Sequence, residues 1–107
     1  MDETLLEKAN KLPLLPGVYL MRDQRGDIIY VGKAKKLKMR VSSYFHGDHL
    51  PKVAAMCAKV ADFEVVVVNS EFEALMLENA LIKRHMPRYN ILLKDDKGYP
   101  FLRLDMR

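Results

Sequence analysis

The sequence predicts an α/β domain of the α+β type, with a small mixed, mainly antiparallel central sheet flanked by helices. Two observations support this class. Residues 17–32 contain two segments rich in β-branched and aromatic residues on either side of a short turn, which is the pattern of an antiparallel hairpin. Over most of the remaining chain, apolar residues recur every three or four positions, as in amphipathic helices. With 107 residues, the chain is expected to fold as one domain spanning 1–107.

The first elements are expected to be a short helix followed by the hairpin. Leucines and alanine on one face predict the helix over residues 3–12. The strands are GVYLMRD at 17–23 and DIIYVG at 27–32, with QRG as the turn between them. Tyr19 and Tyr30 lie in these strands, where tyrosine typically packs and keeps its hydroxyl satisfied at the rim.

A basic amphipathic helix is expected to begin directly after the second strand and to run to about Tyr44. One face is apolar, formed by Ala34, Leu37, Val41 and Phe45. On a wheel of about 100° per residue, an adjacent face carries Lys33, Lys36, Arg40 and Tyr44. Because anions bind well where a helix follows a strand, we expect Lys33, Lys36 and Arg40 to bind phosphate. Lys35 and Lys38 point elsewhere on the wheel and are interpreted as solvated charge.

The rest of the chain alternates between helical and strand patterns. The expected elements are a helix at 51–61, a strand at 63–68, a helix at 71–85, and strands at 89–94 and 99–104. Because FEVVVV is apolar on both faces, its strand is expected to be central in the sheet. Ser70 and Glu73 form a capping box at the start of the fourth helix of the pattern. Asp95 and Asp96 precede Lys97–Gly98 and are interpreted as turn residues.

Glu78 places a carboxylate within the apolar face of the helix at 71–85. A charge removed from water costs several kcal/mol unless it is paired or binds a metal ion. Two interpretations therefore remain open from the pattern alone. Glu78 is either a metal ligand or the partner of a cation such as Lys33 or Arg40.

The charge distribution favours an anionic partner. The net charge is +4 and the sequence pI about 9.2. The cations gather in two clusters, one between residues 33 and 40 and one formed by Lys83, Arg84 and Arg88. Such clusters suit a polyanion, of which nucleic acid is the commonest.

Other features indicate the cellular setting. The single Cys57 cannot form an internal disulfide and is interpreted as a small buried hydrophobe, which fits a reducing, cytoplasmic location. No apolar run approaches the roughly 18 residues of a membrane span, so no membrane partner is expected. The acidic, amphipathic start MDETLLEKANKL is not a signal peptide. His46, His49 and Cys57 do not make a convincing zinc site.

An ordered set of motifs resembles the GIY-YIG nuclease family. The set is GVY at 17–19, YVGKA at 30–34, Arg40, Glu78 and Asn90, with valine replacing the family isoleucine in both tripeptides. Over about Leu12 to Leu104, the chain also resembles the N-terminal domain of the UvrC family of bacterial nucleotide excision repair endonucleases. The resemblance implies that the chain is the N-terminal nuclease part of a multidomain protein.

The resemblance also implies roles for particular residues. Glu78 matches the ligand of one divalent cation, Mg²⁺ or Mn²⁺, and Arg40 matches the arginine that neutralises charge on the phosphate. Tyr30 matches the tyrosine proposed as general base, whose pKa would have to be lowered by a cation such as Lys33. The further active-site positions are Tyr19, Gly32, Lys33, Tyr44 and Asn90. Every motif position is occupied by a compatible residue, so the resemblance implies an active enzyme.

The function implied is hydrolysis of a DNA phosphodiester 3′ to a lesion. The implied partners are damaged double-stranded DNA and, through the full-length protein, the complex of UvrB with DNA, while the isolated domain is expected to be monomeric. Two alternatives are weighed against this function. In the first, the domain is a module that docks on DNA or protein, and Glu78 is a buried salt-bridge partner. In the second, the domain is a stand-alone structure-specific or homing-type nuclease of the same family.

Overall fold

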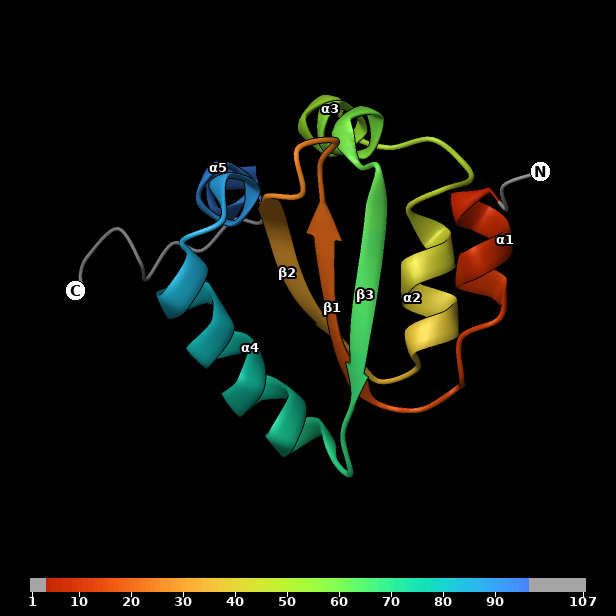
Figure 1. The fold of residues 1–107 in the computed structure, drawn as a ribbon, viewed down its shortest axis with the longest axis vertical. Coiled ribbons are helices and arrows are strands. Elements are labelled where there is room, and N and C mark those ends of the chain that lie inside the picture. The colour runs from red at the N-terminus through yellow and green to blue at the C-terminus, as the bar shows by residue number, and fades with distance from the viewer. Residues whose placement is uncertain (1–3, 97–107) are drawn as a thin grey trace.

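The computed structural model describes residues 4–96 and shows a three-stranded sheet with helices on both faces (Figure 1). The elements in chain order are α1 (Leu5–Asn10), β1 (Gly17–Arg22), β2 (Ile28–Ala34), α2 (Leu37–Ser43), α3 (Pro51–Lys59), β3 (Asp62–Val67), α4 (Glu71–His85) and α5 (Arg88–Asp96). The predicted class, a small sheet flanked by helices, is confirmed. Every strand pairing in the described part is antiparallel. Within residues 4–96, no helix is long and apolar enough to cross a membrane.

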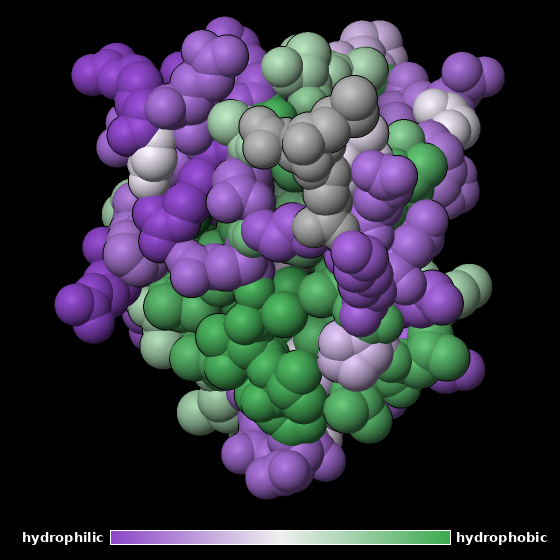
Figure 2. Space-filling view, turned by 45° about the vertical axis from the view of Figure 1, so that its right-hand side comes forward, coloured by the Kyte–Doolittle hydropathy of each residue, from purple (hydrophilic) through white to green (hydrophobic). Residues whose placement is uncertain are grey.

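The strand order is β2-β1-β3, which puts the first hairpin strand in the centre of the sheet. The expected hairpin is confirmed, with Tyr19 opposite Gly32 and Met21 opposite Tyr30. The prediction that residues 63–68 form a central strand is wrong, because within residues 4–96 β3 pairs only with β1 and lies at an edge of the sheet. Val66 and Val67 near its end are 41% and 47% exposed. A broad hydrophobic area is visible on the side of the molecule that carries α1 and α2 (Figure 2).

Each face of the sheet has its own hydrophobic cluster. Helix α4 covers one face, where Ala74 packs with Val18, Leu20 and Val31. The other face packs against side chains of α1, α2, α3 and α5. This second cluster contains three buried tyrosines, Tyr19, Tyr30 and Tyr44. The aromatic cluster and α4 therefore lie on opposite sides of the same three strands.

Helix α2 begins four residues later than the sequence predicted. Lys33 and Ala34 still belong to β2, because they pair with Val18 and Gly17 of β1 and the ladder continues to that point. The helix then starts at Leu37, whose backbone N–H donates to the carbonyl of Leu15 at 2.9 Å. The wheel that put Lys33 and Lys36 on one helical face with Arg40 is therefore wrong.

The start of α4 follows the predicted cap with one difference. The Ser70 hydroxyl accepts from the backbone N–H of Glu73 at 3.1 Å, as expected. The Glu73 carboxylate accepts from the backbone N–H of Asn69 at 3.0 Å, one residue before the predicted donor. The helix ends at His85, as predicted, and Met86 turns the chain with a left-handed φ of 44°.

The prediction of a strand at 89–94 is wrong, because these residues belong to helix α5. Tyr89 and Leu93 are buried four residues apart, which is the helical period, while Ile91 and Leu92 between them are exposed. Asp95 and Asp96 consequently end this helix instead of forming a turn. The second strand expected there, at 99–104, lies outside the described residues.

Candidate active site at the end of strand β2

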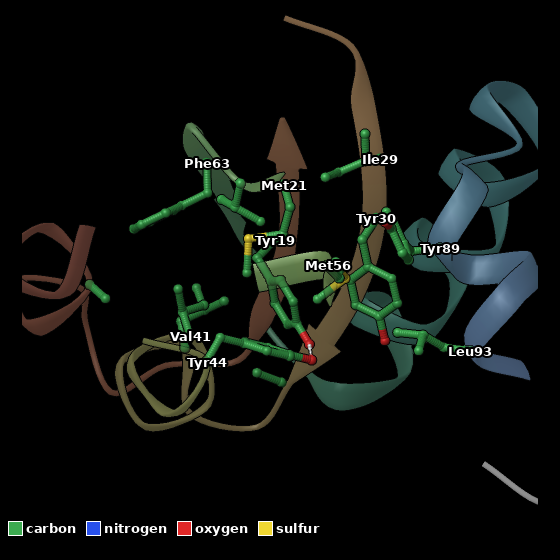
Figure 3. Close-up of a cluster of buried hydrophobic side chains, with 14 residues drawn as sticks. Tyr19, Met21, Ile29, Tyr30, Val41, Tyr44, Met56, Phe63, Tyr89 and Leu93 are labelled. Carbon is green, nitrogen blue, oxygen red and sulfur yellow. Dashed lines mark hydrogen bonds between the residues drawn. The ribbon is translucent and has the colours of Figure 1, made fainter. Parts of the chain in front are cut away.

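Three tyrosines from three elements meet beside the end of β2 (Figure 3). Tyr19 of β1, Tyr30 of β2 and the residue after α2, Tyr44, have ring centroids 5.6 to 6.3 Å apart. The hydroxyls of Tyr19 and Tyr44 form a hydrogen bond of 2.7 Å. All three side chains are at least nine-tenths buried. The packing role predicted for Tyr19 and Tyr30 is thus confirmed, and their hydroxyls gather at one place.

Burial keeps the two hydrogen-bonded phenols in their neutral form. It raises the pKa of Tyr19 well above its ordinary value, and the neighbouring Tyr44 and Tyr30 add to this effect. Burial, followed by the effect of Tyr30, raises the pKa of Tyr44 to about 12, although Tyr19 and Arg40 act in the opposite direction. Near neutral pH, Tyr19 and Tyr44 therefore remain hydrogen-bond donors.

Arg40 is the cation that faces this cluster. Its guanidinium carbon lies 5.2 Å from the centre of the Tyr44 ring, within the range of a cation–π contact. Burial disfavours its charge, but Tyr19 and Tyr44 outweigh that effect and raise the pKa of Arg40. Since the residue as a whole is exposed, its charged head can meet a ligand while the ring of Tyr44 orients it.

Gly32 is required by the packing of Tyr19. A Cβ atom at Gly32 would overlap the ring and the hydroxyl of Tyr19, the residue opposite it in the hairpin. Any side chain at position 32 would therefore displace the phenol of Tyr19. Gly17 has a similar role, because a Cβ there would lie 2.5 Å from the carbonyl oxygen of Val66.

Asn90 of α5 binds the outer edge of β2 through its side-chain amide. Its Oδ1 accepts from the backbone N–H of Val31 and its Nδ2 donates to the carbonyl of Val31, both at 2.8 Å. Val31 separates Tyr30 from Gly32 in the chain. Asn90 therefore holds the backbone between these two candidate active-site residues.

A cleft of about 500 Å³ opens beside the end of β2. It is lined by Lys33, Ala34, Lys35, Lys36, Met39, Arg40, Ser43, Glu71 and Ala74. The cations Lys33, Lys36 and Arg40 are thus brought together as expected, although they come from a strand, a bend and a helix. Lys35, which was interpreted as solvated charge pointing elsewhere, also lines this cleft.

Lys33 does not share a face of the sheet with Tyr30. Side chains alternate along a strand, so Lys33 lies on the face of Val31, which is the face that α4 covers. Tyr30 belongs to the cluster on the opposite face. The prediction that Lys33 lowers the pKa of Tyr30 is therefore wrong, because the two side chains lie on opposite faces of the sheet. Arg40 is a cation on the face that carries the tyrosines.

Glu78 is half-buried in the middle of α4. It follows Leu77 and precedes Leu81 and Ile82 by about one helical turn, and these three side chains are partly buried against the sheet. Within the part of the chain that the structure describes, no three histidine, cysteine or acidic side chains form a cluster able to hold a metal ion. His46, His49 and Cys57 do not form such a cluster. A single protein carboxylate is a donor set that suits Mg²⁺, which keeps most of its water ligands.

The position of Glu71 in the cleft wall was not predicted from the sequence. Glu71 lies in the first turn of α4, where the helix dipole favours a negative charge, and its side chain also lines the basic cleft. Glu71 and Glu78 are seven residues apart and so share one face of the helix, separated by about 10 Å. The seven-residue spacing is the sequence signal that could have placed Glu71 on the same face as Glu78. A separation of about 10 Å along the helix is too long for both carboxylates to bind one ion. The stacking of the His49 ring on that of Tyr44, with centroids 6.4 Å apart, had no comparable signal in the sequence.

Comparison with known proteins agrees with these features. Residues 15–91 match the model of the UvrC-like GIY-YIG domain. The chain belongs to this family. Over 100 residues, which are 94% of the chain, it is 60% identical to UvrABC system protein C of Desulfitobacterium hafniense (strain Y51). It is 58% identical over 102 residues to UvrABC system protein C of Gloeobacter violaceus. The family expected from GVY, YVGKA, Arg40, Glu78 and Asn90 is confirmed.

Solved structures show the same fold. The crystal structure of the GIY-YIG N-terminal endonuclease domain of UvrC from Thermotoga maritima, bound to its catalytic magnesium, matches with a TM-score of 0.74 and 38% identity. The match covers 83% of this chain and 98% of that one. The enzyme class expected from the sequence, a divalent-cation-dependent endonuclease, is therefore that of the family. The chain spans only 16% of the length of either curated relative named above.

Proposed function

We propose that this UvrC-like GIY-YIG domain hydrolyses one phosphodiester bond of damaged double-stranded DNA, on the 3′ side of the lesion, in nucleotide excision repair. The observation that carries the proposal is the convergence of Arg40 and three buried phenols at the end of β2, beside a cleft lined with cations. A phosphate entering that cleft meets lysine and guanidinium groups. The phenols beside Arg40 supply hydroxyl groups for handling a proton.

Glu78 is the residue that would hold the divalent cation. The fit rests on chemistry: a half-buried carboxylate, outside any acidic cluster of the described residues, suits one Mg²⁺ or Mn²⁺ with water and phosphate as its other ligands. When bound, such an ion supplies charge stabilisation for the leaving oxygen. Glu71 lies two helical turns away and does not complete the same coordination shell.

Arg40 is proposed to neutralise the non-bridging oxygens of the phosphate. These oxygens gain negative charge as water attacks phosphorus and the bond to the leaving oxygen breaks. The Tyr44 ring fixes the guanidinium at one side of the cleft. Because that orientation exists before DNA binds, the protein needs little rearrangement to stabilise the transition state. Lys33 and Lys36 are proposed to bind the flanking phosphates of the DNA backbone.

Tyr30 is proposed to take the proton of the attacking water as a phenolate, after its own hydroxyl proton has passed to solvent. Tyr19 and Tyr44 hold their protons near neutral pH and bond to each other, so they serve as donors that orient the polar groups around Tyr30. Arg40, on the same face, favours negative charge on a phenol. Gly32 and Asn90 act indirectly in this scheme, one by admitting Tyr19 and the other by fixing the backbone next to Tyr30.

The partners of this reaction are proposed from the family. The curated relatives are about six times longer than the chain, and lesion recognition is proposed to come from the full-length protein acting on the UvrB–DNA complex. The domain is proposed to work in the cytoplasm and to be monomeric in isolation. No contact between copies is needed to bring Arg40 and the tyrosines together.

A second candidate is a docking module that binds DNA without cutting it. One observation favours it: Glu78 and Tyr30 do not contribute to the lining of the basic cleft, whereas four cations do. In that case, Glu78 would serve as the partner of a cation.

Crystals soaked in Mn²⁺ distinguish the two candidates. The nuclease predicts an anomalous peak beside the Glu78 carboxylate that is lost in Glu78→Gln. A lysine or arginine head in that place, with no peak, would favour the docking module. Glu71→Gln is the matched control, because it removes an equal charge from the same helical face and should leave the Mn²⁺ peak in place.

A further inference from the structure

A second cleft lies at the other end of the hairpin from the active site. It has a volume of about 440 Å³ and lies between the β1–β2 turn, the end of α3 and the start of α5. These three segments gather at one end of the sheet, while β2 runs away from them toward the active-site cleft (Figure 1). Three cations line it, namely Arg25, Lys59 and Arg88. Segments far apart in the sequence thus bring positive charge to one place.

The three cations have no acidic partner within residues 4–93, whose side chains the structure describes. Other cations near the sheet are paired: Lys8 with Asp62, and Arg22 with Glu64. All three side chains are exposed, and the Arg88 guanidinium lies 5.1 Å from the centre of the Tyr89 ring, which restrains it. The cleft therefore presents positive charge that the side chains of residues 4–93 do not neutralise.

Two features of the cleft oppose an anion, and both are weaker than the three cations. Asp23 lines the wall, but its Oδ1 accepts from the backbone N–H groups of Arg25 at 3.0 Å and Asp27 at 3.1 Å, which holds it in the turn. The end of α3 adds a partial negative charge of roughly half a unit. The sum stays positive, so a phosphate is attracted there.

The distance between the two clefts matches a duplex lying along the domain. Seven residues separate Gly26, in the turn, from Lys33 in the active-site cleft, and a strand rises about 3.3 Å per residue. The clefts are therefore about 23 Å apart. DNA advances about 3.4 Å per base pair, so this distance corresponds to roughly seven base pairs.

We propose that Arg25, Lys59 and Arg88 form a second DNA-backbone site, which binds phosphates about seven base pairs from the bond that is cut. This inference rests on the proposed function, because it takes the ligand of the first cleft to be DNA. It also specifies how the DNA lies on the domain. The duplex runs parallel to β2, from the first cleft toward the β1–β2 turn. The second site gives the small domain an orientation on DNA that the active-site cleft alone does not fix.

The test measures the salt dependence of binding to a 30-base-pair duplex by fluorescence anisotropy. The 107-residue chain carries Glu78→Gln throughout, so that the DNA is not cut. Each phosphate contact contributes about 0.9 to the slope of log K against log salt. Replacing Arg25, Lys59 and Arg88 together by alanine should lower the slope by about 2 to 3. Arg25→Lys with Arg88→Lys is the matched control, which keeps the charge and should keep the slope.

The outcomes separate this inference from the proposed nuclease. An unchanged slope in the triple-alanine variant, with a reduced slope in Lys33→Ala/Lys36→Ala, overturns the second site and leaves the first cleft as the DNA site. With a DNA hairpin whose stem has five base pairs, about 17 Å long and so too short to reach both clefts, the triple variant should bind as tightly as its parent. An equal loss on the short and long duplexes would overturn the proposed spacing. Failure of the nuclease would appear elsewhere, as cleavage that survives Glu78→Gln.

Discussion

The side chain of Asn90 pairs with the backbone of Val31 through two hydrogen bonds of 2.8 Å, as a neighbouring strand would. The outer edge of β2 is therefore closed by a helix residue at the point between Tyr30 and Gly32. This contact links α5, which the sequence did not predict, to the residues that the family motif did predict.

Replacing Asn90 by alanine should lower both stability and turnover. The substitution leaves the Val31 N–H and carbonyl without their partner, which should reduce the free energy of unfolding by about 1 to 3 kcal/mol. Since Asn90 is proposed to act through Tyr30 and Gly32, we expect kcat to fall while the Kd for DNA stays near that of the parent. Urea unfolding and single-turnover cleavage measure the two effects. Equal losses in kcat and DNA affinity would contradict a positioning role.

Replacing Tyr30 by phenylalanine should slow cleavage while keeping the fold. The ring still packs with Tyr19 and Tyr44, but the group proposed to accept the proton is gone. The loss expected for a general base is about 10²- to 10⁴-fold. The pH–rate profile should also lose the limb that reports this group. A rate and pH dependence equal to those of the parent would remove Tyr30 from the chemistry.

Tyr44 should make stability depend on pH in the alkaline range. Its pKa is raised to about 12 in the folded state against about 10 for a free phenol. Between these values the unfolded chain releases the proton and the folded chain keeps it, so stability is complete below about pH 10 and falls toward pH 12. The full loss is about 3 kcal/mol. Urea titrations at stepped pH should show a smaller fall in Tyr44→Phe, and an identical fall in both proteins would contradict this origin.

Neutralising Glu71 should tighten DNA binding. Its carboxylate lines the cleft that holds Lys33, Lys36 and Arg40, where it repels phosphate. Glu71→Gln should raise affinity several-fold at low salt, with a smaller gain at 0.15 M salt because screening is stronger there. Glu73→Gln is the control, since Glu73 caps the Asn69 N–H and is not part of the cleft wall. The same gain in both variants would show only an effect of net charge.

The sequence predicted the hairpin and the α4 helix because their signals are local. A turn flanked by β-formers identified β1 and β2, and the Ser70 cap together with Pro87 bounded α4. The central position predicted for β3 was wrong because the order of strands depends on tertiary pairing, which an apolar segment does not encode. The segment is apolar, yet β1 is the strand that lies between the other two. The α5 segment was mispredicted because a short apolar run fits either a strand or a helix, and packing of Tyr89 and Leu93 decides between them.

Residues that the resemblance assigned to the site lie together in the structure, but their predicted arrangement was partly wrong. The motif identified Tyr19, Tyr30, Arg40 and Tyr44, which the structure brings together. The helical wheel failed for Lys33 because the β ladder extends to Ala34 and keeps that lysine on the α4 face. The backbone contact of Asn90 and the position of Glu71 in the cleft depend on tertiary packing, which no local pattern records.

Incision by the full-length protein carrying Glu78→Gln, on damaged DNA loaded with UvrB, tests the central claim most directly. The carboxamide keeps the size of Glu78 and removes the charge proposed to hold the cation. We expect 3′ incision to fall about a hundredfold or more, with the affinity for DNA and the thermal stability kept. Incision at the rate of the parent protein would contradict the claim that this domain is a nuclease working through Glu78.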